Sequence, residues 1–195
     1  MTPILILAAG LSRRMRGADK LLEQVEGVPL VRRQVASAIA AGLAPWVALP
    51  GPDHPRARAL AGLAHHPLVL PGSAEGMGGT LREGVAALPG SARFLIMAAD
   101  LPGLVADDLA TVAATPPGDA LIVIATSEGG ALGHPVMFDA RLRPDFATLS
   151  GDEGARRIVR AHRARMLTVP LPGDHATRDL DTPEDWADWR RETGL

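Results

Sequence analysis

The first twenty residues carry a cationic loop of the kind that binds phosphate groups. An apolar run ends at Gly10, and the loop after it holds four cations, namely Arg13, Arg14, Arg16 and Lys20. A buried strand followed by a glycine-containing cationic loop is a common way to hold a polyphosphate. Neither the P-loop pattern nor the G-x-G-x-x-G dinucleotide pattern can be read here. The segment therefore predicts another kind of phosphate loop, with an ordinary turn and solvated arginines as the alternative.

Asp100 is the acidic residue most suited to act beside such a loop. It follows the apolar run 93–98 and precedes Leu101-Pro102, which predicts a position at the end of a buried strand. Mg²⁺ is usually held by one or two carboxylates together with substrate phosphates. Asp100 is thus a predicted Mg²⁺ ligand, and a plain turn aspartate before proline is the alternative.

A second acidic cluster lies between residues 179 and 185. Thr182, Pro183 and Asp185 have the spacing of a capping box at the start of a helix, which gives them a structural role. Asp179 and Asp181 remain, and their alternate spacing sends both side chains to one face of an extended segment. We predict Asp181 as the second Mg²⁺ ligand.

A glycine-rich loop, Gly76-Met77-Gly78-Gly79, leads into a predicted helix at Thr80. Glycines allow a backbone to approach a ligand closely, and the free N–H groups of the next turn can bind an anion or a base edge. Thr80 is equally suited to be the N-cap of that helix. On its own this loop is a weak signal.

His134 and Arg156 are two further residues with open roles. His134 lies between Gly133 and Pro135 with no accompanying catalytic or metal pattern, which favours a structural role. Arg156 follows a turn in which Asp152 is the expected N-cap of a helix. Its side chain faces either solvent or an anionic substrate.

Composition limits the function classes. The 195 residues have a net charge of −2 and 47% hydrophobic content, which fits a single globular domain over residues 1–195 and disfavours a general nucleic-acid binder. The absence of cysteine excludes thiol nucleophiles, disulfides and Cys-bound zinc. The apolar run at residues 4–9 is too short to cross a membrane, and no basic segment typical of a signal peptide precedes it. We expect a soluble cytoplasmic protein.

Strands and helices alternate along the chain. We expect strands at 3–9, 46–49, 68–70, 93–98, 120–125 and 166–169, helices at 29–42, 56–63, 80–88, 106–114, from 152 and from 183, and a loop at 129–135. This order predicts an α/β protein with one Rossmann-like open sheet, mostly parallel, and helices on both faces. Ligands of such sheets bind beyond the carboxyl ends of the strands, where the 10–20 loop and Asp100 are expected.

Seven short motifs occur in order along nearly the whole chain. They are Leu7-Ala8-Ala9-Gly10-x-Ser12-x-Arg14-Met15 with Lys20, Gly27-x-Pro29, Gly76-Met77-Gly78, Asp100-x-Pro102, Gly133-His134-Pro135, Gly151-Asp152-x-Gly154-Ala155-Arg156, and Asp179-x-Asp181-Thr182-Pro183. Together they resemble the nucleotidyltransferases of molybdenum-cofactor maturation. The resemblance is greatest to the type that joins CTP to molybdopterin, with the guanylyltransferase type as its sister.

The resemblance implies a fold of the nucleotide-diphospho-sugar transferase type. It also implies transfer of CMP from CTP to the terminal phosphate of molybdopterin, with release of pyrophosphate. The implied partners are an NTP, molybdopterin, and a maturation chaperone or apo-enzyme that receives the product. Catalysis would fall to Arg14, Lys20 and Asp100, with Mg²⁺ at Asp100 and Asp181 and cofactor contacts at His134 and Arg156. The implied nucleotide-binding residues are Leu7, Ala8, Ala9, Gly10, Ser12, Arg14, Lys20, Gly76, Met77, Gly78 and Thr80.

Several departures and alternatives stay open. Ala8-Ala9-Gly10 looks like the cytidylyl type, since guanylyl relatives tend to carry Ala-Gly-Gly. Arg16 stands where relatives usually have glycine, whereas Arg13 is expected to lie at the surface. The alternatives are a GTP-using enzyme, an enzyme with a sugar phosphate or other acceptor, and a molybdopterin carrier without turnover.

Overall fold

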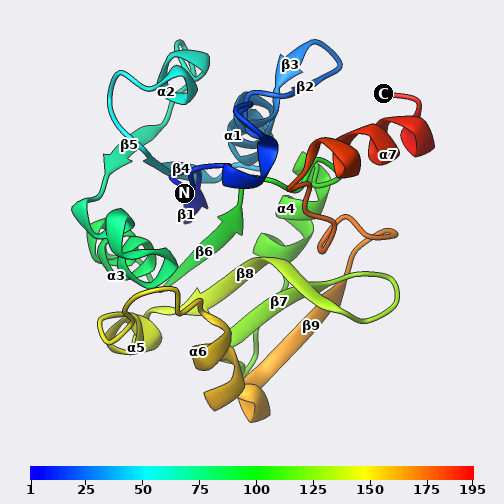
Figure 1. Ribbon diagram of the computed structural model, residues 1–195. Helices are drawn as coiled ribbons and strands as arrows, with labels where there is room; N and C mark the ends of the chain where they lie inside the picture. Colours follow the sequence, from blue (N-terminus) through cyan, green and yellow to red (C-terminus); the bar gives the residue numbers. More distant parts are fainter.

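The computed structural model describes residues 1–195 and contains a seven-stranded sheet with helices on both faces (Figure 1). The strand order is β5-β4-β1-β6-β8-β7-β9, and every neighbouring pair is parallel except the two pairs that include β8. The strands are β1 (Pro3–Leu7), β4 (Ala44–Leu49), β5 (His66–Val69), β6 (Arg93–Ala98), β7 (Ile122–Thr126), β8 (Leu132–Asp139) and β9 (Met166–Pro170), and a small hairpin joins β2 (Gln24–Val25) to β3 (Val28–Pro29). The predicted α/β open sheet is confirmed.

Two apolar cores lie on opposite faces of the sheet. Ile4 and Ile6 of β1 face one core, whereas Leu5 between them faces the other. This alternation follows from the two-residue period of a strand, and it explains why strands covered on both faces are continuously apolar. No helix combines the length and apolar character needed to span a membrane. The helices are α1 (Leu30–Ala40), α2 (Pro55–Ala59), α3 (Met77–Ala87), α4 (Ala106–Ala114), α5 (Arg143–Phe146), α6 (Arg156–Ala161) and α7 (Pro183–Thr193).

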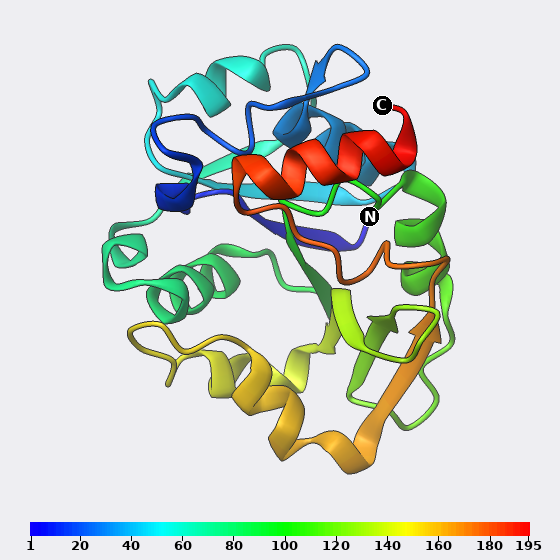
Figure 2. The same ribbon diagram turned by 45° about the vertical axis from the view of Figure 1, so that its right-hand side comes forward.

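The C-terminal segment crosses back to the N-terminal half of the molecule (Figure 2). After β9 at the sheet edge, the chain passes the end of β6, where the Leu180 N–H donates to the Asp100 carbonyl at 3.1 Å. Helix α7 then buries Trp186 in the same core as α1. The predicted capping box is present, since Thr182 and Asp185 exchange hydrogen bonds of 3.1 and 2.8 Å. This return path brings the 179–181 acids to Asp100.

The predicted loop at 129–135 is wrong, because β8 begins at Leu132. Strand β8 contains Gly133 and Pro135, two residue types that usually interrupt strands, and the structure explains each of them. A Cβ at Gly133 would come within 2.0 Å of the Ala176 carbonyl oxygen, so only glycine fits. Pro135 lies at the register shift between β7 and β8, and such bulges tolerate a residue without an N–H.

Two predicted helix starts are also wrong. Helix α3 begins at Met77, so Thr80 is not its N-cap and instead donates from Oγ1 to the Gly76 carbonyl at 3.1 Å. The glycines of this turn indicated a loop in the sequence. In the structure two of them lie inside the helix, and glycine is required at position 78 because a Cβ there would lie 2.5 Å from the Ser150 carbonyl oxygen. Helix α6 begins at Arg156 after Ala155, and Asp152 caps nothing there. Close backbone packing thus selected glycine inside a helix, against its propensity.

Candidate functional site

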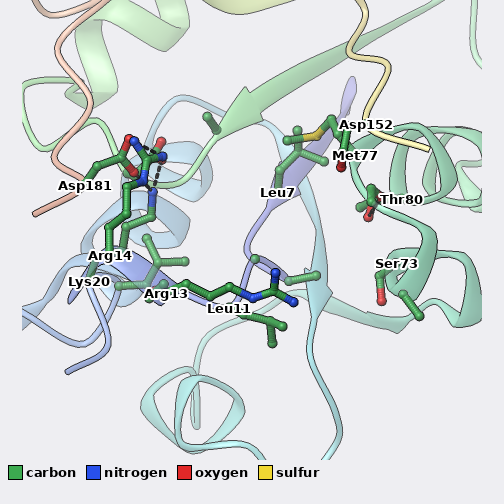
Figure 3. Close-up of a pocket in the computed structure, with 18 of the residues that line it drawn as sticks. Leu7, Leu11, Arg13, Arg14, Lys20, Ser73, Met77, Thr80, Asp152 and Asp181 are labelled. Carbon is green, nitrogen blue, oxygen red and sulfur yellow. Dashed lines mark hydrogen bonds and ion pairs between the residues drawn. The ribbon is translucent and has the colours of Figure 1, made fainter. Parts of the chain in front are cut away.

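A cluster of opposite charges stands at the carboxyl ends of β1 and β6. Lys20 Nζ lies 2.5 Å from Asp100 Oδ2 and 2.6 Å from Asp181 Oδ1, and each of these three side chains is less than one-fifth exposed. An Arg14 guanidinium nitrogen lies 2.6 Å from Asp181 Oδ2 (Figure 3). Burial alone would lower the pKa of Lys20, but the Asp100 and Asp181 carboxylates outweigh it and raise that pKa above its usual value. Lys20 is therefore a fixed cation.

Asp179 joins Asp100 and Asp181 in a three-carboxylate group. Oxygen atoms from the three side chains lie within 4.8 Å of one another. Burial, followed by the like charges of the other two, raises the pKa of Asp179. Asp100 Oδ1 is buried and has no hydrogen-bond partner. A divalent cation suits this set of oxygen donors. The Asp-x-Asp spacing had placed Asp179 on the face of Asp181, but only Asp181 had been predicted as a ligand.

The first cavity opens beside this charged cluster and has a volume of about 650 Å³. The cationic loop forms one side, and Ser73, Met77, Thr80 and Asp152 form the other (Figure 3). Residues 73–75 were not predicted as part of the site, although their position directly before the glycine-rich loop at 76–79 was a usable signal. The lining residues are Leu7, Ala9, Gly10, Leu11, Ser12, Arg13, Arg14, Lys20, Leu21, Ser73, Ala74, Glu75, Gly76, Met77, Thr80, Ala98, Asp100, Asp152 and Asp181.

Two of the predicted nucleotide-binding residues do not line this cavity. Ala8 is fully buried, its N–H donates to the Ala48 carbonyl, and its own carbonyl accepts from Arg56. Gly78 is buried as well, and its N–H donates to the Gly151 carbonyl at 2.7 Å. The other predicted residues do line the cavity, namely Leu7, Ala9, Gly10, Ser12, Arg14, Lys20, Gly76, Met77 and Thr80.

The structure places the two remaining arginines of the cationic loop. Arg13 is exposed, as expected, and it also lines the first cavity. Arg16 points to α7 and pairs with Glu184 at 2.7 Å, with both side chains well exposed. The side chain of Arg16 thus ties the loop to the start of α7 and is not part of the cavity wall.

A second cavity of about 850 Å³ adjoins the first and shares the charged cluster with it. Its wall includes His134 and Arg156, the two residues with open roles, together with Arg160 and Arg163. Burial lowers the pKa of His134, whose Nδ1 lies 3.4 Å from the Ile96 carbonyl oxygen. Apolar residues of the sheet, α3 and α6 form much of the remaining wall, namely Leu81, Ile96, Ile124, Leu132, Val136, Val159 and Met166. Residues that line both cavities are Leu7, Arg14, Lys20, Met77, Ala98, Asp100, Asp152 and Asp181.

A comparison with protein families assigns this arrangement to a known class. The model of the MobA-like NTP transferase domain matches residues 4–166. The chain belongs to this family. Membership makes it a nucleotidyltransferase, as the motifs had predicted, and it favours an enzyme over a carrier without turnover.

The chain also matches individual relatives over nearly their whole length. The chain is 32% identical to a molybdenum cofactor guanylyltransferase of Bradyrhizobium, with 97% of this chain and 92% of the relative covered. It is 29% identical to the purine catabolism protein PucB of Bacillus subtilis, with coverages of 95% and 94%.

The fold is shared with Rv0371c of Mycobacterium tuberculosis. The TM-score is 0.78 at 25% identity, and the match covers 100% of this chain and 99% of the other. A manganese complex of the same protein matches with a TM-score of 0.76 at 22% identity, over 96% of each chain. The sheet and helices described above are therefore those of known solved structures.

Proposed function

We propose that this nucleotidyltransferase moves CMP from CTP to the terminal phosphate of molybdopterin and releases pyrophosphate. One observation carries the proposal: two adjoining cavities share a wall that contains the charged cluster of Lys20, Asp100 and Asp181. A group-transfer enzyme needs such a meeting point, because donor and acceptor must react without leaving the protein. Volumes of about 650 and 850 Å³ also fall in the usual range of small-molecule sites.

The first cavity suits the nucleotide. Its walls hold the cations Arg13, Arg14 and Lys20, which can neutralise a triphosphate. Ala9 and Gly10 also line this cavity, and glycine allows a ligand to approach the backbone closely. Residues 73–80 face this loop across the cavity, so that the nucleotide would lie between them.

The second cavity suits a flat acceptor that carries a phosphate. Half of its 26 lining residues are hydrophobic, which fits the ring system of a pterin. Arg156, Arg160 and Arg163 provide positive charge for the phosphate of such a molecule. The guanylyltransferase relative, whose name states a role in the molybdenum cofactor, supports this acceptor.

In the proposed reaction an oxygen of the acceptor phosphate attacks the α-phosphorus of CTP. A new phosphorus–oxygen bond forms while the bond to the β-phosphate oxygen breaks, and pyrophosphate leaves with its electron pair. Lys20, charged and held between two carboxylates, stabilises negative charge at the transferred group. No nucleophile from the protein is required, and catalysis consists of positioning and electrostatic stabilisation.

Asp100 and Asp181 are the proposed ligands of a divalent metal ion, with Asp179 close enough to contribute. The unpartnered Asp100 Oδ1 and the neighbouring carboxylate oxygens fit a hard cation such as Mg²⁺. When bound, this ion supplies positive charge that screens the triphosphate. The manganese complex of the Rv0371c neighbour supports a divalent ion in this fold.

The residue at position 9 bears on the choice of base. Ala9 lines the first cavity and carries a methyl group that a glycine would lack, and the resemblance described above links alanine at this position to the cytidylyl type. This favours CTP. The guanylyltransferase relative favours GTP, which is therefore the second candidate.

The test is a panel of four NTPs against molybdopterin and a set of sugar phosphates, with pyrophosphate release as the readout and Mg²⁺ present. We expect release with CTP and molybdopterin only. Release with GTP alone would replace CTP by the second candidate. Release only with a sugar phosphate would overturn the acceptor, and no release with any pair would overturn the proposed reaction.

A further inference from the structure

Arg56 is a buried cation that lines neither of the two cavities. It belongs to α2, and 2% of its side chain is exposed. A buried charge is costly unless it is paired and fully hydrogen-bonded. No motif in the sequence around Arg56 indicates its role, so we infer the role from its contacts in the structure.

The guanidinium of Arg56 uses all its donors on one loop. Its Nε donates to both carboxylate oxygens of Asp19 at 3.0 and 2.8 Å, and a terminal nitrogen donates to the same residue at 2.7 Å. The other terminal nitrogen donates to the carbonyls of Ala8 and Gly10 at 2.6 and 2.7 Å. Ser12 Oγ accepts a further bond of 2.9 Å. Arg56 thus joins the beginning, middle and end of the loop.

The backbone of this loop is strained between those anchor points. Ser12 and Arg16 have φ angles of 49° and 52°, in the left-handed region that side chains disfavour. Between them lies a short 3₁₀ turn, Arg13–Met15, which carries two cations of the first cavity. Strained residues of this kind persist when surrounding contacts over-determine the conformation. The contacts of Arg56 meet that requirement.

We propose that Arg56 is a positioning residue for the nucleotide. With Asp19 it holds the loop, before any nucleotide arrives, in the conformation that presents Arg13, which lines only the first cavity, to the nucleotide. Arg56 itself touches no substrate. This inference rests on the proposed nucleotide in the first cavity, and it predicts that loss of the clamp weakens nucleotide binding while acceptor binding stays intact.

The test compares Arg56→Lys and Asp19→Asn with the parent and with a control, Arg143→Lys. Arg143 also donates to three backbone carbonyls, those of Val85, Leu88 and Pro89, but it lines neither cavity. Three measurements are made: melting temperature, hydrogen exchange of the amides of residues 10–16 without ligand, and titration calorimetry with CTP and Mg²⁺. Steady-state KM values for CTP and acceptor complete the set.

We expect faster exchange at residues 10–16 and about tenfold weaker CTP binding in Arg56→Lys, with acceptor KM within twofold of the parent. Asp19→Asn should show the same pattern to a smaller degree, and Arg143→Lys should change only the melting temperature. A folded Arg56→Lys with parental loop exchange and parental CTP affinity would overturn the inference. If the parent binds no CTP, the proposed function fails, whereas hydrogen exchange still decides whether Arg56 holds the loop.

Discussion

The two cavities are built in different ways although they share the same charged cluster. The first is walled by loops, and one of these is held in a strained conformation through the buried Arg56. The second is walled by the sheet, α3 and α6, with apolar side chains and arginines. Hydrophobic residues thus make up a larger share of the lining in the second cavity than in the first.

This difference indicates a division between the two substrates. A phosphate-rich ligand can be held by backbone groups and cations of a preformed loop, whereas a ring system needs an apolar wall. Substitutions in one wall should therefore change the KM of one substrate, and substitutions in the shared cluster should change kcat. The following predictions test that division in order of expected effect.

Asp100→Asn should lower kcat by about 10²- to 10³-fold, because it removes a charge from the shared cluster without removing bulk. Both KM values should stay within a few-fold of the parent. Asp107→Asn, at an exposed position in the first turn of α4, is the control and should retain parental kcat. Steady-state kinetics with both substrates measures this. A parental kcat in Asp100→Asn would mean that the shared cluster takes no part in catalysis.

Arg156→Ala should raise the acceptor KM by about tenfold and leave the nucleotide KM unchanged, because Arg156 lines only the second cavity. Its neighbour Arg157 provides a matched control, since it donates to Thr148 Oγ1 and lines neither cavity. An equal rise of both KM values in Arg156→Ala would contradict the assignment of one cavity to each substrate. A rise of the acceptor KM in Arg157→Ala as well would contradict it too.

Ala9→Gly should shift the preference from CTP towards GTP by about threefold to tenfold, the scale of one methyl group in a binding pocket. The ratio of kcat/KM for the two nucleotides measures it, with acceptor KM as an internal control. An unchanged ratio would show that the wall formed by residues 73–80, and not the loop, selects the base.

Much of the fold was predictable because apolar runs and helix signals are local. Helix α4 and strand β6 match their predicted bounds, and the capping box at Thr182 is present. The failures occurred where glycine and proline serve long-range packing. Gly78 and Gly133 lie against distant backbone, and no local pattern distinguishes this from a loop.

The candidate site was predictable where several motifs converge on one strand end. Lys20, Asp100 and Asp181 do lie together, as the carboxyl-end rule of open sheets suggests. Arg56 was not predictable, because its role depends on carbonyl groups whose directions only the folded loop defines. Asp179 was within reach of the sequence reasoning, and its contribution became clear only from the return path of the C-terminal segment.

The smallest expected effect is a loss of stability at acidic pH that arises from His134 in the wall of the second cavity. Burial lowers the pKa of His134 below its ordinary value of 6.5, so the unfolded chain binds a proton more readily than the folded one. The free energy of unfolding should therefore not be reduced by His134 above pH 6.5, and it should decrease as the pH drops below that value.

His134→Gln should flatten this dependence in urea titrations between pH 5 and 7.5. The flattening should be partial, because burial also lowers the pKa of His54 beside the Arg56 clamp, and that group responds to acid in the same direction. An identical pH slope in parent and variant would mean that the second cavity does not hold His134 neutral. Acid would then lower the stability through His54, beside the loop of the first cavity, and not through the second cavity.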